Sequence, residues 1–191
     1  MADKRRNLKN QKDRTKHLPL IKGGTTAARR LREPVFGEDN PANFIILRLD
    51  KKCKLDLTHP VHAEILINHL TYLRQEHWIL LAGFVLLPEQ FQVLLTPVDQ
   101  RLLPDILKNF TGFTAQQINF FLKRTGPIWS HVIEQNVITD HQELRKYQDR
   151  LKLQPAEYTL IEDPAHWPWS SFHRAHEHLY DRDFFSLASN L

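Results

Sequence analysis

The chain has 191 residues, of which 41% are hydrophobic, so it can form one domain with a buried core plus an appendage. It contains no run of about 18 uninterrupted apolar residues, and its charged N-terminus lacks an apolar stretch, which argues against a membrane span and a secretory signal. A single cysteine, Cys53, excludes an internal disulfide and fits a reducing cytoplasm. We therefore expect a cytoplasmic protein without membrane contact, in which Cys53 is an incidental surface thiol.

The net charge of +4 is unevenly distributed. Residues 1–33 hold eleven of the 26 Lys and Arg and three of the 22 Asp and Glu, which leaves 15 basic and 19 acidic residues in the remainder. A basic arm of this kind commonly contacts nucleic acid and should be disordered when free, although it could simply keep the chain soluble. We expect a flexible arm and linker over residues 1–40, an α+β domain over residues 41–178 and a C-terminal tail over residues 179–191.

The first elements of the expected domain are a strand and a helix. Asn43–Leu49 is a short apolar run bounded by turn residues, as is typical of a strand. Thr58 should cap a helix that begins near His59–Pro60, since proline is tolerated in the first turn. Apolar residues recur there at helical spacing, and the helix should end around Glu76.

Two strand-like runs follow, Trp78–Leu87 and Phe91–Pro97, and their short separation predicts a hairpin. Gln90 and Gln92 are two residues apart, so in a strand they point to the same face while Phe91 points to the other. A pair of polar residues on one face of an otherwise apolar sheet marks a candidate site.

The second half of the domain begins with a long helix. Apolar residues at helical spacing extend over residues 103–122, with Gly112 expected to loosen the helix and Gly126–Pro127 to stop it. Ile128–Ile133 and Asn136–Ile138 are short and could be extended.

A polar helix should span Glu143 to Gln154 and end at Pro155. The order of elements is then strand, helix, strand, strand, helix, extended piece, helix. A central antiparallel sheet with helices on one face satisfies this order, which predicts an α+β, ferredoxin-like fold.

Five short stretches carry a resemblance to a known family when they are taken in order. They are LLPEQFQVLLTP (residues 86–97), FTAQQIN (113–119), GPIW (126–129), NVITD (136–140) and DPAHWPWSS (163–171). In these stretches the chain resembles the REP-associated tyrosine transposases, a branch of the single-tyrosine HUH transposases. The resemblance spans roughly residues 44–172.

The resemblance implies a chemistry whose parts are replaced here. In the family, two same-face histidines hold a divalent metal and a tyrosine on a helix attacks DNA. Their places fall on Gln90, Gln92 and Arg150 in this chain. A glutamine carbonyl is a weaker ligand for a transition metal than an imidazole, and a guanidinium stays protonated. We expect a pseudoenzyme with no metal and no cofactor, although a weak Mg²⁺ site stays open and Tyr147 is a candidate surrogate nucleophile.

The expected function is binding of single-stranded or hairpin DNA without cleavage. A protein- or RNA-binding adaptor on the transposase fold and an active DNA-nicking transposase with substituted catalytic residues remain alternatives, and a homodimer stays open because family members include monomers and dimers. The candidate nucleic-acid-binding residues are the basic side chains of the arm and of the two later helices: Lys4, Arg5, Arg6, Arg29, Arg30, Arg32, Lys108, Lys123, Arg124, Arg145, Lys146, Arg150 and Lys152.

The C-terminal part of the domain is rich in tryptophan and histidine. Trp167 and Trp169 could stack on bases, but we expect them to pin this segment to the core. His173, His176 and His178 lack acidic or cysteine partners, so we expect a solvated surface helix there rather than a metal site.

Overall fold

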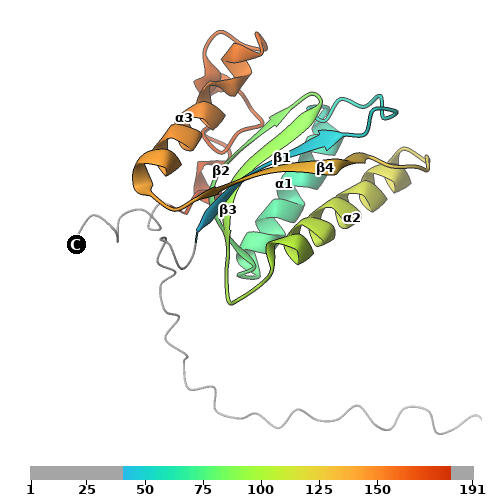
Figure 1. Cartoon of the computed structure of the whole chain (residues 1–191). Helices are drawn as coiled ribbons and strands as arrows, with labels where there is room; N and C mark the ends of the chain where they lie inside the picture. Colours follow the sequence, from blue (N-terminus) through green and yellow to red (C-terminus); the bar gives the residue numbers. More distant parts are fainter. Residues whose placement is uncertain (1–40, 182–191) are drawn as a thin grey trace, which may run out of the picture. The chain divides into compact units, whose positions relative to one another are not determined.

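The computed structural model describes residues 41–181 (Figure 1). The arm residues named above and the end of the chain lie outside this range. The elements in chain order are β1 (Ala42–Leu49), α1 (Pro60–Gln75), β2 (Ile79–Leu87), β3 (Gln90–Pro97), α2 (Leu103–Phe121), β4 (Trp129–Ile138), α3 (His141–Glu157) and the 3-10 turns η1 (Pro164–His166) and η2 (Glu177–Leu179). This composition confirms the predicted α+β class. No helix within residues 41–181 combines the length and the apolar character that crossing a membrane requires.

The four strands form one antiparallel sheet in the order β2-β3-β1-β4, which is the predicted ferredoxin-like arrangement. β2 and β3 form the predicted hairpin, and β1 lies between β3 and β4. The register places Arg48 opposite Gln90, and Ile46 opposite both Gln92 and Glu134.

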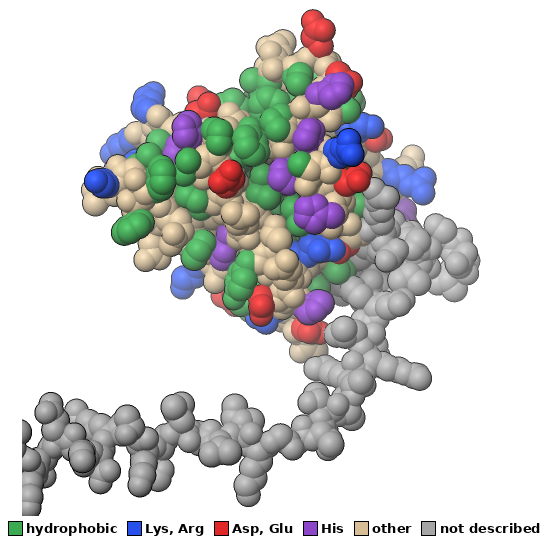
Figure 2. All heavy atoms as spheres, turned by 180° about the vertical axis from the view of Figure 1, so that it is seen from behind, with side chains coloured by type: hydrophobic (Ala, Val, Ile, Leu, Met, Phe, Trp, Pro, Cys, Tyr) green, Lys and Arg blue, Asp and Glu red, His purple; other side chains and the backbone are tan. Residues whose placement is uncertain are grey.

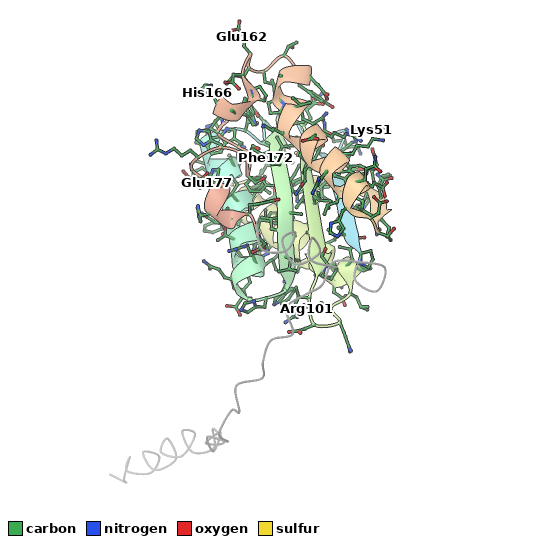
Figure 3. All side chains as sticks on the ribbon, turned by 90° about the vertical axis from the view of Figure 1, so that its left-hand side faces the viewer. Lys51, Arg101, Glu162, His166, Phe172 and Glu177 are labelled. Carbon is green, nitrogen blue, oxygen red and sulfur yellow. The ribbon has the colours of Figure 1, made fainter. Side chains whose placement is uncertain are left out.

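The sheet is covered on both faces, so the expectation of helices on one face only was wrong. Ile45, Leu47 and Phe91 belong to a core cluster shared with α1 and α2, and we call this side the α1–α2 face. Phe44 and Ile46 belong to a second cluster shared with α3, on what we call the α3 face. Figure 3 views the latter side, with α3 crossing in front of the strands. Successive apolar side chains of β1 point to opposite faces of the sheet. Both faces must therefore be covered by other elements.

The predicted ends of α1 and α2 need correction. His59, not Thr58, is the N-cap of α1, because the Thr58 hydroxyl donates instead to the Asp56 carboxylate at 2.5 Å. α2 ends at Phe121, before the Gly126–Pro127 signal, since the chain turns at Lys123 with a φ of 51°. Gly112 lies inside the uninterrupted helix.

Two further predictions were wrong at β4 and α3. β4 is one strand of ten residues rather than two short pieces, because β1 provides it with a continuous partner apart from a register shift between Leu47 and Leu49. Pro155 lies inside α3, which continues to Glu157. Pro155 donates no helical hydrogen bond, but the carbonyls of Gln154 and Pro155 still accept from Tyr158 N and Leu160 N, each at 2.9 Å.

The surface position expected for Cys53 was also wrong. Cys53 is 7% exposed, belongs to the core on the α1–α2 face and accepts a hydrogen bond from Arg124 Nη1 at 3.2 Å. The packed domain also extends beyond the expected boundary at residue 178. Leu179 is buried, and the Asp181 carboxylate accepts a hydrogen bond from Arg74 Nε at 2.9 Å.

Two of the stretches that carry the resemblance, FTAQQIN and GPIW, are joined to each other by hydrogen bonds. Trp129 Nε1 donates to Thr114 Oγ1 at 2.9 Å, and the same hydroxyl donates to the Phe110 carbonyl at 2.7 Å. Asn119 Nδ2 donates to the Gly126 carbonyl at 2.9 Å. These contacts fix the start of β4 against α2.

The C-terminal stretch DPAHWPWSS lies along the outer edge of β2. Trp167 Nε1 donates to the Leu86 carbonyl at 2.9 Å, and Leu86 N donates to the Trp169 carbonyl at 2.8 Å. Ser171 N donates to the Phe84 carbonyl at 3.1 Å. The two tryptophans therefore pin this segment to the core, as expected, and the segment closes one edge of the sheet.

Gly83 allows α3 and the C-terminal segment to approach β2 closely. It sits at a register shift between Leu81 and Gly83 with a φ of 152°. A Cβ there would lie 3.2 Å from Leu151 Cδ1 and 3.4 Å from Phe172 Cζ. In Figure 3 Phe172 lies over the sheet beside α3. A side chain at this position would require Leu151 to shift slightly, and the backbone would hold it at a φ that residues other than glycine rarely adopt.

Replacing Thr114 with valine should destabilise the fold, because the substitution leaves the buried Trp129 indole N–H without an acceptor. We expect a loss of about 1–3 kcal/mol in the free energy of unfolding, measured by urea denaturation. Thr114→Ser is the matched control, since it keeps the hydroxyl and removes one methyl group. Equal stability of the two variants would contradict this role for the hydrogen bond.

Candidate functional site on the α3 face

The glutamine pair lies where the strand alternation predicts. Gln90 and Gln92 begin β3, and both point to the α3 face with exposed fractions of 3% and 1%. Phe91, between them, belongs to the core cluster on the opposite side. Two buried amides must each find hydrogen-bond partners, since a buried polar group without one is costly.

Gln90 is part of a chain of side chains that we call the Gln90 network: Glu134, Arg48, Gln90 and Tyr158. Arg48 Nη1 donates to Gln90 Oε1 at 2.6 Å, and Gln90 Nε2 donates to Tyr158 Oη at 2.6 Å. Arg48 Nε donates to Glu134 Oε1 at 2.9 Å, and this bond raises the pKa of the guanidinium. A guanidinium cannot accept hydrogen bonds, so its contact fixes which end of the Gln90 amide is the oxygen.

Gln92 joins β3 to the C-terminal end of α3. Its Nε2 donates to Gln154 Oε1 at 2.8 Å, and Gln154 donates in turn to the Glu157 carboxylate through a short hydrogen bond. Gln92 Oε1 is buried and has no hydrogen-bond partner in the described part of the chain. Both glutamines therefore bond to the last turn of α3 or to the residue that follows it.

Arg150 lies on α3 one turn before Gln154, so Gln90, Gln92 and Arg150, the three positions that the resemblance singles out, occupy one region of the α3 face. Its side chain is exposed, and its guanidinium carbon lies 5.2 Å from the Phe44 ring centroid. Tyr147, the candidate surrogate nucleophile, is half-buried and packs its ring 4.6 Å from Phe44. That contact gives Tyr147 a packing role.

These donors do not suit a divalent metal. The Gln90 carbonyl oxygen already accepts from a guanidinium, and a metal bound to it would lie beside that positive charge. The only carboxylate in the Gln90 network, Glu134, is paired with the same guanidinium. Within residues 41–181 no group of three His, Cys, Asp or Glu could hold a metal ion.

The C-terminal histidines adopt a different arrangement from the expected surface helix. They lie in turns, and the rings of His173 and His176 are 6.4 Å apart. His176 is half-buried, 6.1 Å from the Phe84 ring. Burial lowers its pKa, with further lowering by His173 and His178.

The candidate basic residues within the domain fall into two groups on opposite faces of the sheet. Lys108 belongs to α2, and Lys123 and Arg124 follow that helix on the α1–α2 face. The second group consists of the α3 residues Arg145, Lys146, Arg150 and Lys152, all of which are exposed. Figure 2 shows Lys and Arg scattered among acids and histidines on the face that it views, without a continuous basic patch. The structure does not bring all of these residues to one surface.

A separate hollow of about 570 Å³ lies between α1 and α2. The His69 ring stacks on Phe113 at 4.1 Å and accepts or donates a hydrogen bond with Asn109 at 2.9 Å. Burial lowers the pKa of His69, and the contact with Asn109 opposes that effect. None of the candidate residues lines this hollow, so the α3 face remains the candidate site.

Sequence reasoning missed four residues of the site, namely Arg48, Glu134, Gln154 and Tyr158. Arg48 had a local signal, because it is the one charged residue in the apolar run Asn43–Leu49. Its contact with Gln90 depends on the register between β1 and β3, which the sequence does not specify.

The structure is similar to that of a REP-associated tyrosine transposase bound to a REP hairpin, with 17% identity, a TM-score of 0.61 and coverage of 73% of this chain and 82% of the other. The chain therefore has the fold of that transposase. A protein of Deinococcus radiodurans R1 named as a transposase candidate matches with 16% identity over 59% of this chain and 91% of the other, but its TM-score of 0.44 is too low to carry an argument. No family model and no curated protein matches the chain.

The amide pair Gln92–Gln154 should show measurable coupling. Gln92→Leu or Gln154→Leu alone leaves a buried amide without its partner, so each should lower the free energy of unfolding by about 1–3 kcal/mol. The double variant should lose less than the sum of the two single losses. Chemical denaturation of the four proteins measures the coupling, and strictly additive losses would contradict the pairing.

Arg48 should oppose metal binding even when histidines are present. We expect Gln90→His/Gln92→His to bind Mn²⁺ weakly, and additional Arg48→Gln to tighten binding by roughly tenfold or more, since it removes a positive charge next to position 90. Titration calorimetry measures both variants. Equal affinity for Mn²⁺ would show that the guanidinium is not the obstacle.

Proposed function

We propose that this protein is a transposase-like protein that binds single-stranded or hairpin DNA without cleaving it. The main support is the Gln90 network. Gln90 stands at one of the two positions where the resemblance implies a metal ligand, and its amide is hydrogen-bonded to the Arg48 guanidinium and the Tyr158 hydroxyl instead. The similar solved structure, which is bound to a REP hairpin, supports hairpin DNA as the ligand.

The chemistry that strand transfer needs supports the part of the proposal that excludes cleavage. A tyrosine nucleophile needs a free hydroxyl next to the phosphate, and the phosphate needs a Lewis acid. Arg150 cannot act as a nucleophile, and the Tyr147 ring packs on Phe44. Tyr158 is half exposed, but its hydroxyl accepts a hydrogen bond from Gln90. The described residues thus favour a binding role over a catalytic one.

The DNA backbone would contact the exposed basic residues of α3. Lys146 and Arg150 are one helical turn apart, so both can face the same backbone, and guanidinium groups pair well with phosphate oxygens. Arg48 is 46% exposed at the side chain and lies on the same face of the sheet. A phosphate could replace Glu134 as its partner. Binding through such contacts weakens as salt is added.

Removal of two α3 charges should weaken hairpin binding selectively. We expect Lys146→Ala/Arg150→Ala to reduce affinity for a labelled hairpin by about tenfold and to flatten the dependence on salt, since each lost contact to a single strand lowers the slope by about 0.7. Fluorescence anisotropy of the full chain across a salt series measures both. Lys108→Ala/Lys123→Ala, on the opposite face, is the matched control and should have little effect.

The other outcomes favour the alternatives. Equal loss in both double variants, with duplex bound as well as hairpin, would indicate non-specific charge attraction and favour the protein- or RNA-binding adaptor. A nicked product that requires Mn²⁺ and disappears in Tyr147→Phe would indicate an active transposase with substituted residues.

A further inference from the structure

The two edges of the sheet differ in how they are covered. The β2 edge is closed by the C-terminal segment, since Leu86 N donates to the Trp169 carbonyl and Asp181 N donates to the Leu81 carbonyl. β4 is bonded to β1 on one side, and no strand within residues 41–181 pairs with its other side. Figure 1 shows β4 along this edge of the sheet.

β4 has few of the features that usually prevent an edge strand from pairing: one charged residue, Glu134, and a register shift near its start. It has ten residues and contains neither proline nor lysine. Seven consecutive residues, His131 to Val137, are exposed. Val132, Ile133 and Val137 are 71%, 39% and 54% exposed, so apolar groups lie on both faces of the strand. The register shift is confined to its beginning, and residues 133–138 pair regularly with β1.

The order of residues in β4 is self-complementary. The stretch VIEQNVI, residues 132–138, has the same sequence of residue classes when it is read in either direction from Gln135. In an antiparallel pair centred on Gln135, Ile133 would lie opposite the partner's Val137 and Val132 opposite the partner's Ile138. Apolar cross-strand pairs of this kind stabilise a sheet.

The polar positions are also compatible with such a pair. Glu134 would lie opposite the partner's Asn136, so the two glutamates do not face each other, and each is already bonded to Arg48 of its own chain. Gln135 Nε2 donates to Asn43 Oδ1 at 2.8 Å, which leaves its second N–H and its carbonyl oxygen for the partner's Gln135. The two glutamates are diagonal neighbours across the axis, and the Arg48 guanidinium paired with each one offsets its charge.

We propose that β4 pairs antiparallel with β4 of a second copy of this chain, about a two-fold axis at Gln135, to form a homodimer with one continuous sheet. A two-fold axis perpendicular to the sheet makes the interface isologous and keeps the α3 faces of both subunits on the same side. The two α3-face sites then border a shared surface. This interface does not depend on the proposed DNA binding.

The test uses charge variants at two exposed positions of the full chain, where substitutions should not unfold the domain. Ile133→Lys/Val137→Lys would place like charges opposite each other across the interface, and we expect association at least about tenfold weaker. Ile133→Lys/Val137→Glu would place opposite charges there, and we expect dimers to return. Sedimentation velocity over a concentration series measures the dimer fraction, and circular dichroism confirms folding.

The register has its own test. A short thiol cross-linker should join two chains of Gln135→Cys, because the introduced thiols would face each other at the two-fold axis, whereas Cys53 is buried. Val132→Cys, whose partner position is Ile138, is the control and should cross-link poorly. A wild-type chain that stays monomeric at every concentration would overturn the proposal, as would a dimer that responds equally to both charge variants.

The alternative to a second copy is that the N-terminal arm of the same chain pairs with the β4 edge. In that case hydrogen exchange at residues 131–137 would be slow and independent of protein concentration. The dimer predicts protection that rises with concentration, so concentration-independent protection would also overturn it.

Discussion

The structure depends on burying both faces of one four-stranded sheet. α1 and α2 cover one face, and the single helix α3 covers the other together with the C-terminal segment. A single helix is narrower than the sheet that it covers. Specific contacts must therefore fix the position of α3 on the sheet. Leu144 and Leu151 supply apolar contact, and the hydrogen bond between Gln92 and Gln154 holds the last turn against β3.

That requirement gives a structural role to the two glutamines, which stand where the resemblance places the histidines that bind metal. A histidine pair that binds metal must keep its ring nitrogens available to the ion. The Gln90 amide instead forms hydrogen bonds with Arg48 and Tyr158, and the Gln92 amide forms one with Gln154 of α3. These hydrogen bonds of the two glutamines therefore help to dock α3 and the residue that follows it against the sheet.

The sequence predicted the features that depend on local periodicity. It did not predict the features that depend on contacts between residues far apart in the chain. Strand alternation placed Gln90 and Gln92 on one face, and the apolar runs identified β1 and the hairpin. The sequence could not show that Arg48 contacts Gln90. These residues are 42 positions apart, and the register between β1 and β3 brings them together. β4 was predicted as two pieces because the polar residues Glu134 and Gln135 interrupt its apolar residues, and its continuity comes from β1. The second face was missed because α3 reads as a polar helix, although Leu144 and Leu151 are fully buried.

The stretches that resemble the transposases divide by physical role. FTAQQIN bonds to GPIW, the Asp140 carboxylate of NVITD caps α3 by accepting from Glu143 N, and DPAHWPWSS closes the β2 edge. All of these contacts maintain the fold. The glutamine pair and Arg150, which stand where the resemblance places the reactive groups of the family, lie on the α3 face. There the two glutamines bond to Arg48, Tyr158 and Gln154, so hydrogen bonds of side chains also hold this end of α3 against β3.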